Sequence, residues 1–190
     1  MATVINVEPL IKLTSEAFYQ LCLTNPDIPM EKSPQGDLII MPPVGGESGN
    51  REANLIADLA IWNRKSKLGQ VFSSSTIFKL PQGGDRSPDV AWVSQEKWDS
   101  LTLEEKKKFP PLCPDFVIEL RSESDRLKPL QEKMKEYLNS GLRLGWLINP
   151  QDGEVEIYRA EKPVEVLKMP CVLLGEDVLP DFDLEMDING

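Results

Sequence analysis

The stretch Asp115-Phe116-Val117-Ile118-Glu119-Leu120-Arg121 decides the fold, because it is the clearest strand in the 190-residue sequence. Side chains in a strand alternate between two faces, and both alternating sets are mostly apolar here. Such a strand is typical of the centre of a sheet that is covered on both sides. Glu119 is the exception, because an ionised carboxylate in this position is costly unless it is paired or binds a metal.

A second short run, Ser87-Pro88-Asp89-Val90-Ala91-Trp92-Val93, places Asp89 in similar surroundings. If the two strands are neighbours, Asp89 and Glu119 can coordinate one Mg²⁺ or Mn²⁺. A bound metal of this kind lowers the pKa of a water molecule and stabilises charge on a phosphoryl oxygen. The two acids therefore predict a metal site. The alternative is that Glu119 forms an ion pair with Arg121 and that Asp89 only begins a strand.

Hydrophobic periodicity and turn residues predict the other elements. Helices are expected after a cap at Thr14 or Ser15, over a segment that carries residues 53–62 and ends near Gly69, and over 98–109 and 127–141. Strands are expected over 28–31 and 38–41 as a hairpin, and over 71–80, 144–148 and 155–158. This order indicates an α/β (α+β) protein with a mixed sheet and helices against it. The length fits a single domain over residues 1–190.

Composition excludes several classes of protein. The sequence contains no histidine, which rules out every mechanism that needs one, including Ser-His-Asp triads and HExxH zinc sites. The three cysteines form no CxxC pair, so free thiols in a reducing compartment are expected. The sequence has no long apolar run and no secretory signal, and we expect a soluble cytoplasmic protein. The sequence also contains neither of the glycine-rich nucleotide-binding motifs GxGxxG and GxxxxGKS.

The motifs in order resemble one known family. They are Ser87-Pro88-Asp89-Val90, the stretch Pro114 to Asp125, Lys133-Met134-Lys135-Glu136-Tyr137 and the stretch Gly141 to Pro150. Together they resemble the Uma-two family, common in cyanobacteria and placed in the PD-(D/E)XK nuclease superfamily. The resemblance covers a core of about 13–184 and implies a restriction-endonuclease-like fold, with a central mixed β-sheet flanked by helices.

The resemblance also implies roles for individual residues. Asp89 matches the first acid of the superfamily and Glu119 the second. The third element is usually a lysine two residues later, where this chain has Arg121, which can hold a phosphate but stays protonated and cannot act as a base. Lys133, four residues before Tyr137, is the expected substitute. Glu47, near the start of the second helix, is a candidate third metal ligand, with Glu52 and Glu31 as weaker ones.

These implications predict a Mg²⁺- or Mn²⁺-dependent endonuclease (a hydrolase) that cleaves DNA phosphodiester bonds, with Asp89, Glu119, Arg121 and Lys133 as catalytic residues. The formal net charge of −10 argues against a DNA partner, unless basic residues form a local groove. The residues expected to contribute are Lys65, Lys67, Lys79, Arg86, Arg121 and Lys133. A homodimer is expected.

Two alternatives remain open at this point. One is a catalytically impaired protein of nuclease fold that acts in binding or regulation, which the arginine at position 121 and the acidity favour. The other is an interaction protein whose acidic segment from Glu176 to Asp187 meets a partner.

Overall fold

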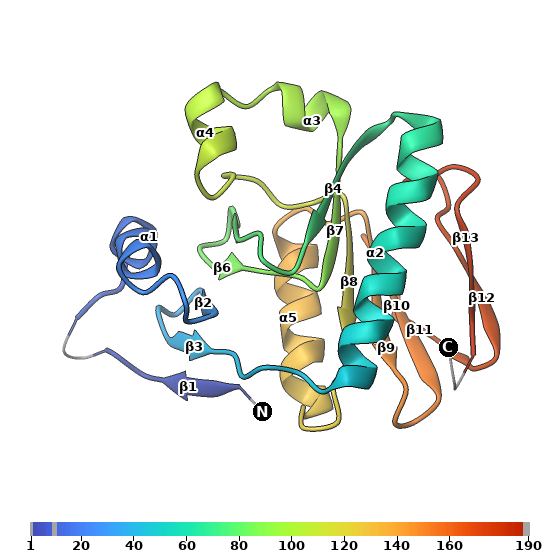
Figure 1. Cartoon of the computed structure of the whole chain (residues 1–190), viewed down its shortest axis with the longest axis horizontal. Coiled ribbons are helices and arrows are strands. Elements are labelled where there is room, and N and C mark those ends of the chain that lie inside the picture. The colour runs from blue at the N-terminus through green and yellow to red at the C-terminus, as the bar shows by residue number, and fades with distance from the viewer. Residues whose placement is uncertain (1, 9–10, 188–190) are drawn as a thin grey trace.

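The computed structural model describes residues 2–8 and 11–187 and is built around a six-stranded mixed sheet (Figure 1). Its strand order is β11-β10-β9-β8-β7-β4. The strands are β4 (Gly69–Ser73), β7 (Val90–Ser94), β8 (Phe116–Leu120), β9 (Leu144–Asn149), β10 (Glu154–Arg159) and β11 (Glu165–Lys168). Strands β8 and β9 are parallel, and the other neighbours in this sheet are antiparallel. The mixed α/β architecture predicted from the sequence is confirmed.

Strand β8 lies inside this sheet, as its mostly apolar pattern predicts. All five of its residues are buried. Its antiparallel neighbour is β7, which follows Asp89, so the two acid-bearing strands are adjacent as the metal hypothesis requires.

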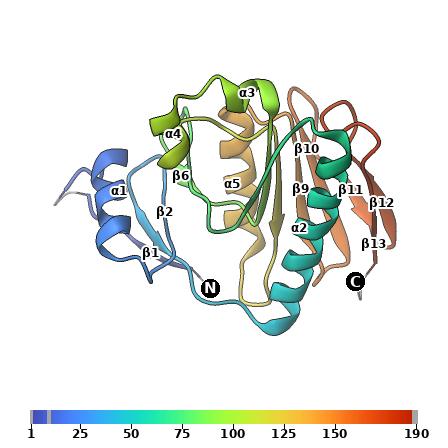
Figure 2. The same cartoon turned by 45° about the horizontal axis from the view of Figure 1, so that its top comes forward.

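Helices cover both faces of this sheet (Figures 1 and 2). Helix α2 (Gly46–Ser66) packs on one face through Leu55 and Leu59, together with the hairpin of β12 (Cys171–Leu174) and β13 (Asp183–Met186). Helix α5 (Leu127–Asn139) packs on the other through Met134 and Tyr137, against a set that includes Ala91 and Val117. Because faces alternate along a strand, Asp89 and Glu119 belong to the α5 face.

A second, five-stranded sheet lies beside α5, in the order β1-β3-β2-β6-β5 (Figure 2). Its strands are β1 (Thr3–Ile5), β2 (Met30–Lys32), β3 (Leu38–Ile40), β5 (Phe78–Lys79) and β6 (Asp85–Arg86). Helix α1 (Ser15–Thr24) begins after the cap Thr14 and packs on it through Phe18. The predicted hairpin is the antiparallel pair β2 and β3. No helix in residues 2–8 and 11–187 has the length and apolar character needed to cross a bilayer.

Two predicted elements are wrong because polar residues interrupt them. The strand predicted over 71–80 is divided between β4 in the large sheet and β5 in the smaller one. A turn follows β4, in which the backbone amide of Thr76 donates to the Ser73 carbonyl at 3.0 Å. The helix predicted over 98–109 is two short helices, α3 (Gln95–Asp99) and α4 (Leu103–Lys107). Thr102 interrupts the predicted helix, because it caps the N-terminus of α4 through a capping box with Glu105.

Gly69 permits the close packing of β4 on β7, and this yields a stability prediction. A methyl group at Gly69 would lie 2.2 Å from the Val93 carbonyl oxygen and 2.6 Å from the Trp92 ring. We expect Gly69→Ala to lower the free energy of unfolding by about 1–3 kcal/mol in urea denaturation, because the backbone must shift. Gly46→Ala is the control, because nothing lies within 4 Å of its added carbon and alanine favours helix. A Gly69→Ala protein as stable as wild type would contradict the packing.

Candidate active site

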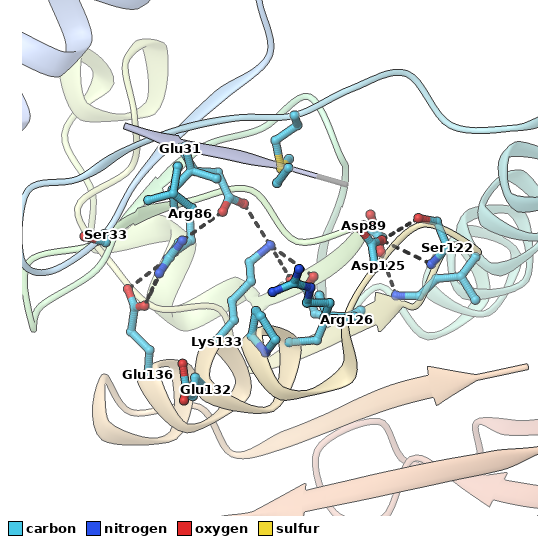
Figure 3. A pocket seen from close by; sticks show the side chains of 18 of the residues that line it. Glu31, Ser33, Arg86, Asp89, Ser122, Asp125, Arg126, Glu132, Lys133 and Glu136 are labelled. Carbon is cyan, nitrogen blue, oxygen red and sulfur yellow. Dashed lines mark hydrogen bonds and ion pairs between the residues drawn. The ribbon is translucent and has the colours of Figure 1, made fainter. Parts of the chain in front are cut away.

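Asp89 and Glu119 lie side by side on the α5 face of the large sheet. Val90 pairs with Ile118, so the antiparallel register brings Asp89, one residue earlier, opposite Glu119, one residue later. The Leu120 amide donates to Asp89 Oδ2 at 2.6 Å and fixes the carboxylate. Both acids line one cavity of about 930 Å³, part of which Figure 3 shows. The two predicted carboxylates therefore converge.

Helix α5 brings Lys133 to this pair. The Lys133 Nζ atom lies 2.8 Å from Glu119 Oε1 and 2.8 Å from Glu31 Oε1, and it donates to the Ser87 carbonyl at 3.2 Å. One helical turn later, the Tyr137 hydroxyl donates to Glu119 Oε1 at 3.0 Å. The Lys-x-x-x-Tyr spacing thus places both side chains on Glu119, which is only 2% exposed.

Glu31, on β2, connects this site to the smaller sheet. Its carboxylate accepts from the Ser87 amide at 2.8 Å and from Arg86 Nη1 at 3.0 Å. Arg86 in turn forms an ion pair with Glu136 of α5, with Nη2 2.6 Å from Oε2 (Figure 3). Gly84 makes room for this pair, because a methyl group there would lie 1.8 Å from Glu136 Oε1.

The cluster carries more negative than positive charge. Four carboxylates (Glu31, Asp89, Glu119 and Glu136) surround two basic groups (Arg86 and Lys133), so two negative charges are unbalanced when all of them are ionised. Residues 2–8 and 11–187 provide no basic partner within ion-pair distance of Asp89. The excess equals the charge of one divalent cation.

The pKa values reflect this imbalance. Burial raises the pKa of Asp89 well above its usual range, and the neighbouring Glu119 charge adds to the effect. Burial also raises the pKa of Glu119, and Lys133 offsets this only in part. Burial acts in the same direction on Glu31, but Lys133 and Arg86 outweigh it, so the pKa of Glu31 is lowered. Burial disfavours the Lys133 ammonium, yet the surrounding carboxylates win and its pKa is raised.

The other predicted site residues lie elsewhere. Arg121 leaves the cluster: its Nη1 lies 2.9 Å from Asp152 Oδ2, and its Nε donates to the Asp125 carbonyl at 3.1 Å. Glu47 forms an ion pair with Arg51 in the first turns of α2, and its side chain is 79% exposed. Neither Arg121 nor Glu47 lines the cavity, whereas Glu52 does. Sequence reasoning gave Glu31 little weight, and it named Arg86 only as a contributor to a basic groove and not as a partner of the buried acids.

The residues present fit a hydrated divalent cation. Within the described ranges no three acidic or cysteine side chains form a ready-made metal cluster. Mg²⁺ does not need one, because it commonly takes one or two carboxylates and keeps several water molecules. Asp89 meets this requirement best, since its carboxylate lies at the cavity wall and the nearby negative charge is unbalanced.

Comparisons with known proteins agree with this architecture. The Uma2 family model, described as "Putative restriction endonuclease", matches residues 15–187. A crystal structure from Anabaena variabilis, described as "a putative nuclease belonging to DUF820", superposes with a TM-score of 0.70 at 19% sequence identity. The match covers 84% of this chain and 87% of that chain, and it confirms the restriction-endonuclease-like fold. The search of curated proteins gave no match.

The shared ion pair of Lys133 yields the second prediction. We expect Lys133→Met to lower the free energy of unfolding by about 3–5 kcal/mol in chemical denaturation, because it leaves Glu31 and Glu119 buried without their common partner. The double variant Lys133→Met/Glu119→Gln is expected to recover part of the loss. Lys107→Met, which removes an exposed pair with Glu104, is the control and is expected to unfold like wild type. Equal stability of the two single variants would contradict the role of Lys133.

Proposed function

This chain belongs to the Uma2 family, and from that membership we propose that the protein is a Mg²⁺- or Mn²⁺-dependent endonuclease that hydrolyses DNA phosphodiester bonds. The observation that supports this most is the convergence of Asp89, Glu119 and Lys133 on one cavity. Asp89 directly precedes β7, Glu119 lies on β8 and Lys133 lies on α5. A homodimer and a cytoplasmic location stay predictions.

Asp89 and Glu119 are the residues that would hold the metal. The carboxylates are held in place from both sides, Asp89 by the Leu120 amide and Glu119 by Tyr137 and Lys133. A metal bound there supplies a water molecule of lowered pKa and neutralises charge on the phosphate. Preorganised ligands of this kind do not have to reorganise during the reaction.

Lys133 acts as a fixed positive charge and not as a base. Its pKa is raised by the surrounding carboxylates, so the ammonium stays protonated at neutral pH. A protonated amine can donate a hydrogen bond to a phosphate oxygen or to the attacking water. Lys133 therefore takes the role that the superfamily gives to the lysine after the second acid, because Arg121 forms an ion pair with Asp152 instead.

One observation favours the alternative of a nuclease-fold protein without catalysis. Lys133 is already shared between Glu31 and Glu119, so two carboxylates hold the ammonium group that would assist a phosphate. A protein of this second kind would bind the metal and the nucleic acid but leave the strand intact. Binding and cleavage must therefore be measured separately.

Cleavage is tested on circular DNA, because only an endonuclease opens a circle. We expect the wild type with Mg²⁺ or Mn²⁺ to nick supercoiled plasmid or open single-stranded circular DNA, and Asp89→Asn to be slower by about 100-fold or more. Asp177→Asn, whose side chain is 83% exposed and forms an ion pair with Arg143, is the matched control and should cleave like wild type. Equal rates for Asp89→Asn and wild type would indicate a contaminant or a different site.

Metal binding is tested by calorimetry with Mn²⁺ in the absence of DNA. We expect Glu119→Gln to weaken binding by at least about tenfold, since one charged ligand is lost. Glu47→Gln should bind like wild type, because that side chain points to solvent and pairs with Arg51. Unchanged affinity in Glu119→Gln would overturn the metal site. Intact binding without any cleavage would favour the inactive alternative.

A further inference from the structure

Part of the lining of the cavity that contains Asp89 and Glu119 is apolar. Ile39, Met41, Pro42 and Val44 contribute to it from β3 and the segment after it, and Leu130 contributes from α5. Val44 is 54% exposed, although it borders a site of several charged groups. Phosphates and sugars do not need such a lining, whereas nucleobases pack well against apolar side chains.

The cavity has few positive charges available for a duplex backbone. Eight acidic and four basic residues line it, and two of the basic ones, Arg86 and Lys133, are held in ion pairs. Arg126 and Lys135 form no ion pair with any residue that the structure describes. Proteins that grip duplex DNA commonly neutralise on the order of 6–10 phosphates. Binding at this cavity must therefore depend more on contacts to bases than on the backbone.

The burial of Glu119 and of Lys133 sets a further limit. Glu119 is 2% exposed and Lys133 is 9% exposed, so a phosphate has to enter the cavity to reach them. A volume of about 930 Å³ falls within the range of pockets that enclose one drug-sized ligand, about 300–1,000 Å³. One or two nucleotides of a strand fit a space of this size. An intact duplex, whose major groove alone is about 12 Å wide, does not.

We propose that the substrate is DNA with an unpaired strand, in which one or two nucleotides enter the cavity. The bases pack against the wall formed by Ile39, Met41, Pro42 and Val44, and Arg126, at the start of α5, contacts a phosphate of the entering strand. This inference rests on the proposed endonuclease function and specifies its substrate.

The experiment compares three DNAs of one sequence with the full chain and Mn²⁺: a single strand, a blunt duplex, and a duplex with an internal three-nucleotide bulge. We expect the single strand and the bulge to be cut at unpaired positions, and the blunt duplex to be cut at least about tenfold more slowly, which is the order of effect of one base contact. A duplex cut as fast as the single strand overturns this inference and leaves the endonuclease function intact.

Variants of the wall identify where the strand binds. Val44→Glu is expected to slow cleavage of the single strand by at least about tenfold, because it puts a charge where a base packs. Ile61→Glu is the matched control, because Ile61 is 50% exposed, lies on α2 and is outside the cavity. Arg126→Gln is expected to raise KM for the single strand, and Lys128→Gln, on the same helix but away from the cavity, is its control.

Binding gives a readout that does not depend on turnover. With Ca²⁺ in place of Mn²⁺, fluorescence anisotropy should show tighter binding of the single strand than of the duplex, and Val44→Glu should remove the difference. Equal binding of both DNAs, or loss of binding in Ile61→Glu as large as in Val44→Glu, overturns the inference. If no DNA is cut but the single strand binds preferentially, the endonuclease proposal fails, while the preference for unpaired DNA is retained.

Discussion

The ammonium group of Lys133, held between the carboxylates of Glu31 and Glu119, is the interaction on which the rest of the site depends. Taking these charges out of water is costly, and only good geometry on both sides compensates for it. That geometry requires α5, β8 and β2 to be in place together, because each supplies one of the three side chains. The same contacts hold Glu119 in the orientation from which it faces the cavity beside Asp89. Structure and proposed chemistry therefore share one set of ion pairs.

The sequence alone located the two central acids, for a physical reason. Each lies in or beside a run whose other residues are apolar, and an acid in such a run has to be compensated. The resemblance to the Uma-two family singled out Lys133, and helical periodicity then places it on the same helix face as Tyr137. The fold family was predicted correctly because the motifs occur along nearly the whole chain. That β7 and β8 are neighbours was only a condition of the metal hypothesis, and the strand order of the sheet meets it.

The remaining site partners could not be read from local patterns. Glu31 and Arg86 are 55 residues apart and meet only because β2 and β6 pair in the smaller sheet. Glu47 looked comparable in sequence, yet the α2 helix begins at Gly46 and points it to solvent beside Arg51. Arg121 follows Glu119 by two residues, but β8 ends at Leu120, and the arginine is free to reach Asp152. Partner choice is a long-range property, which periodicity does not encode.

The smaller sheet has a consequence for how the molecule opens. Glu31 is 2% exposed and joins β2 to α5 through Lys133 and to the segment before β7 through the Ser87 amide, and Arg86 of β6, in the same sheet, joins α5 through Glu136. Detaching that sheet would separate buried charged groups from their partners, both in the sheet and on α5. A half-open state is therefore unfavourable, because several buried ion pairs are broken at once. The two sheets are therefore coupled into a single cooperative unit of unfolding. Amides of β2 should exchange with solvent at rates set by global unfolding, instead of by local fraying of an N-terminal lobe.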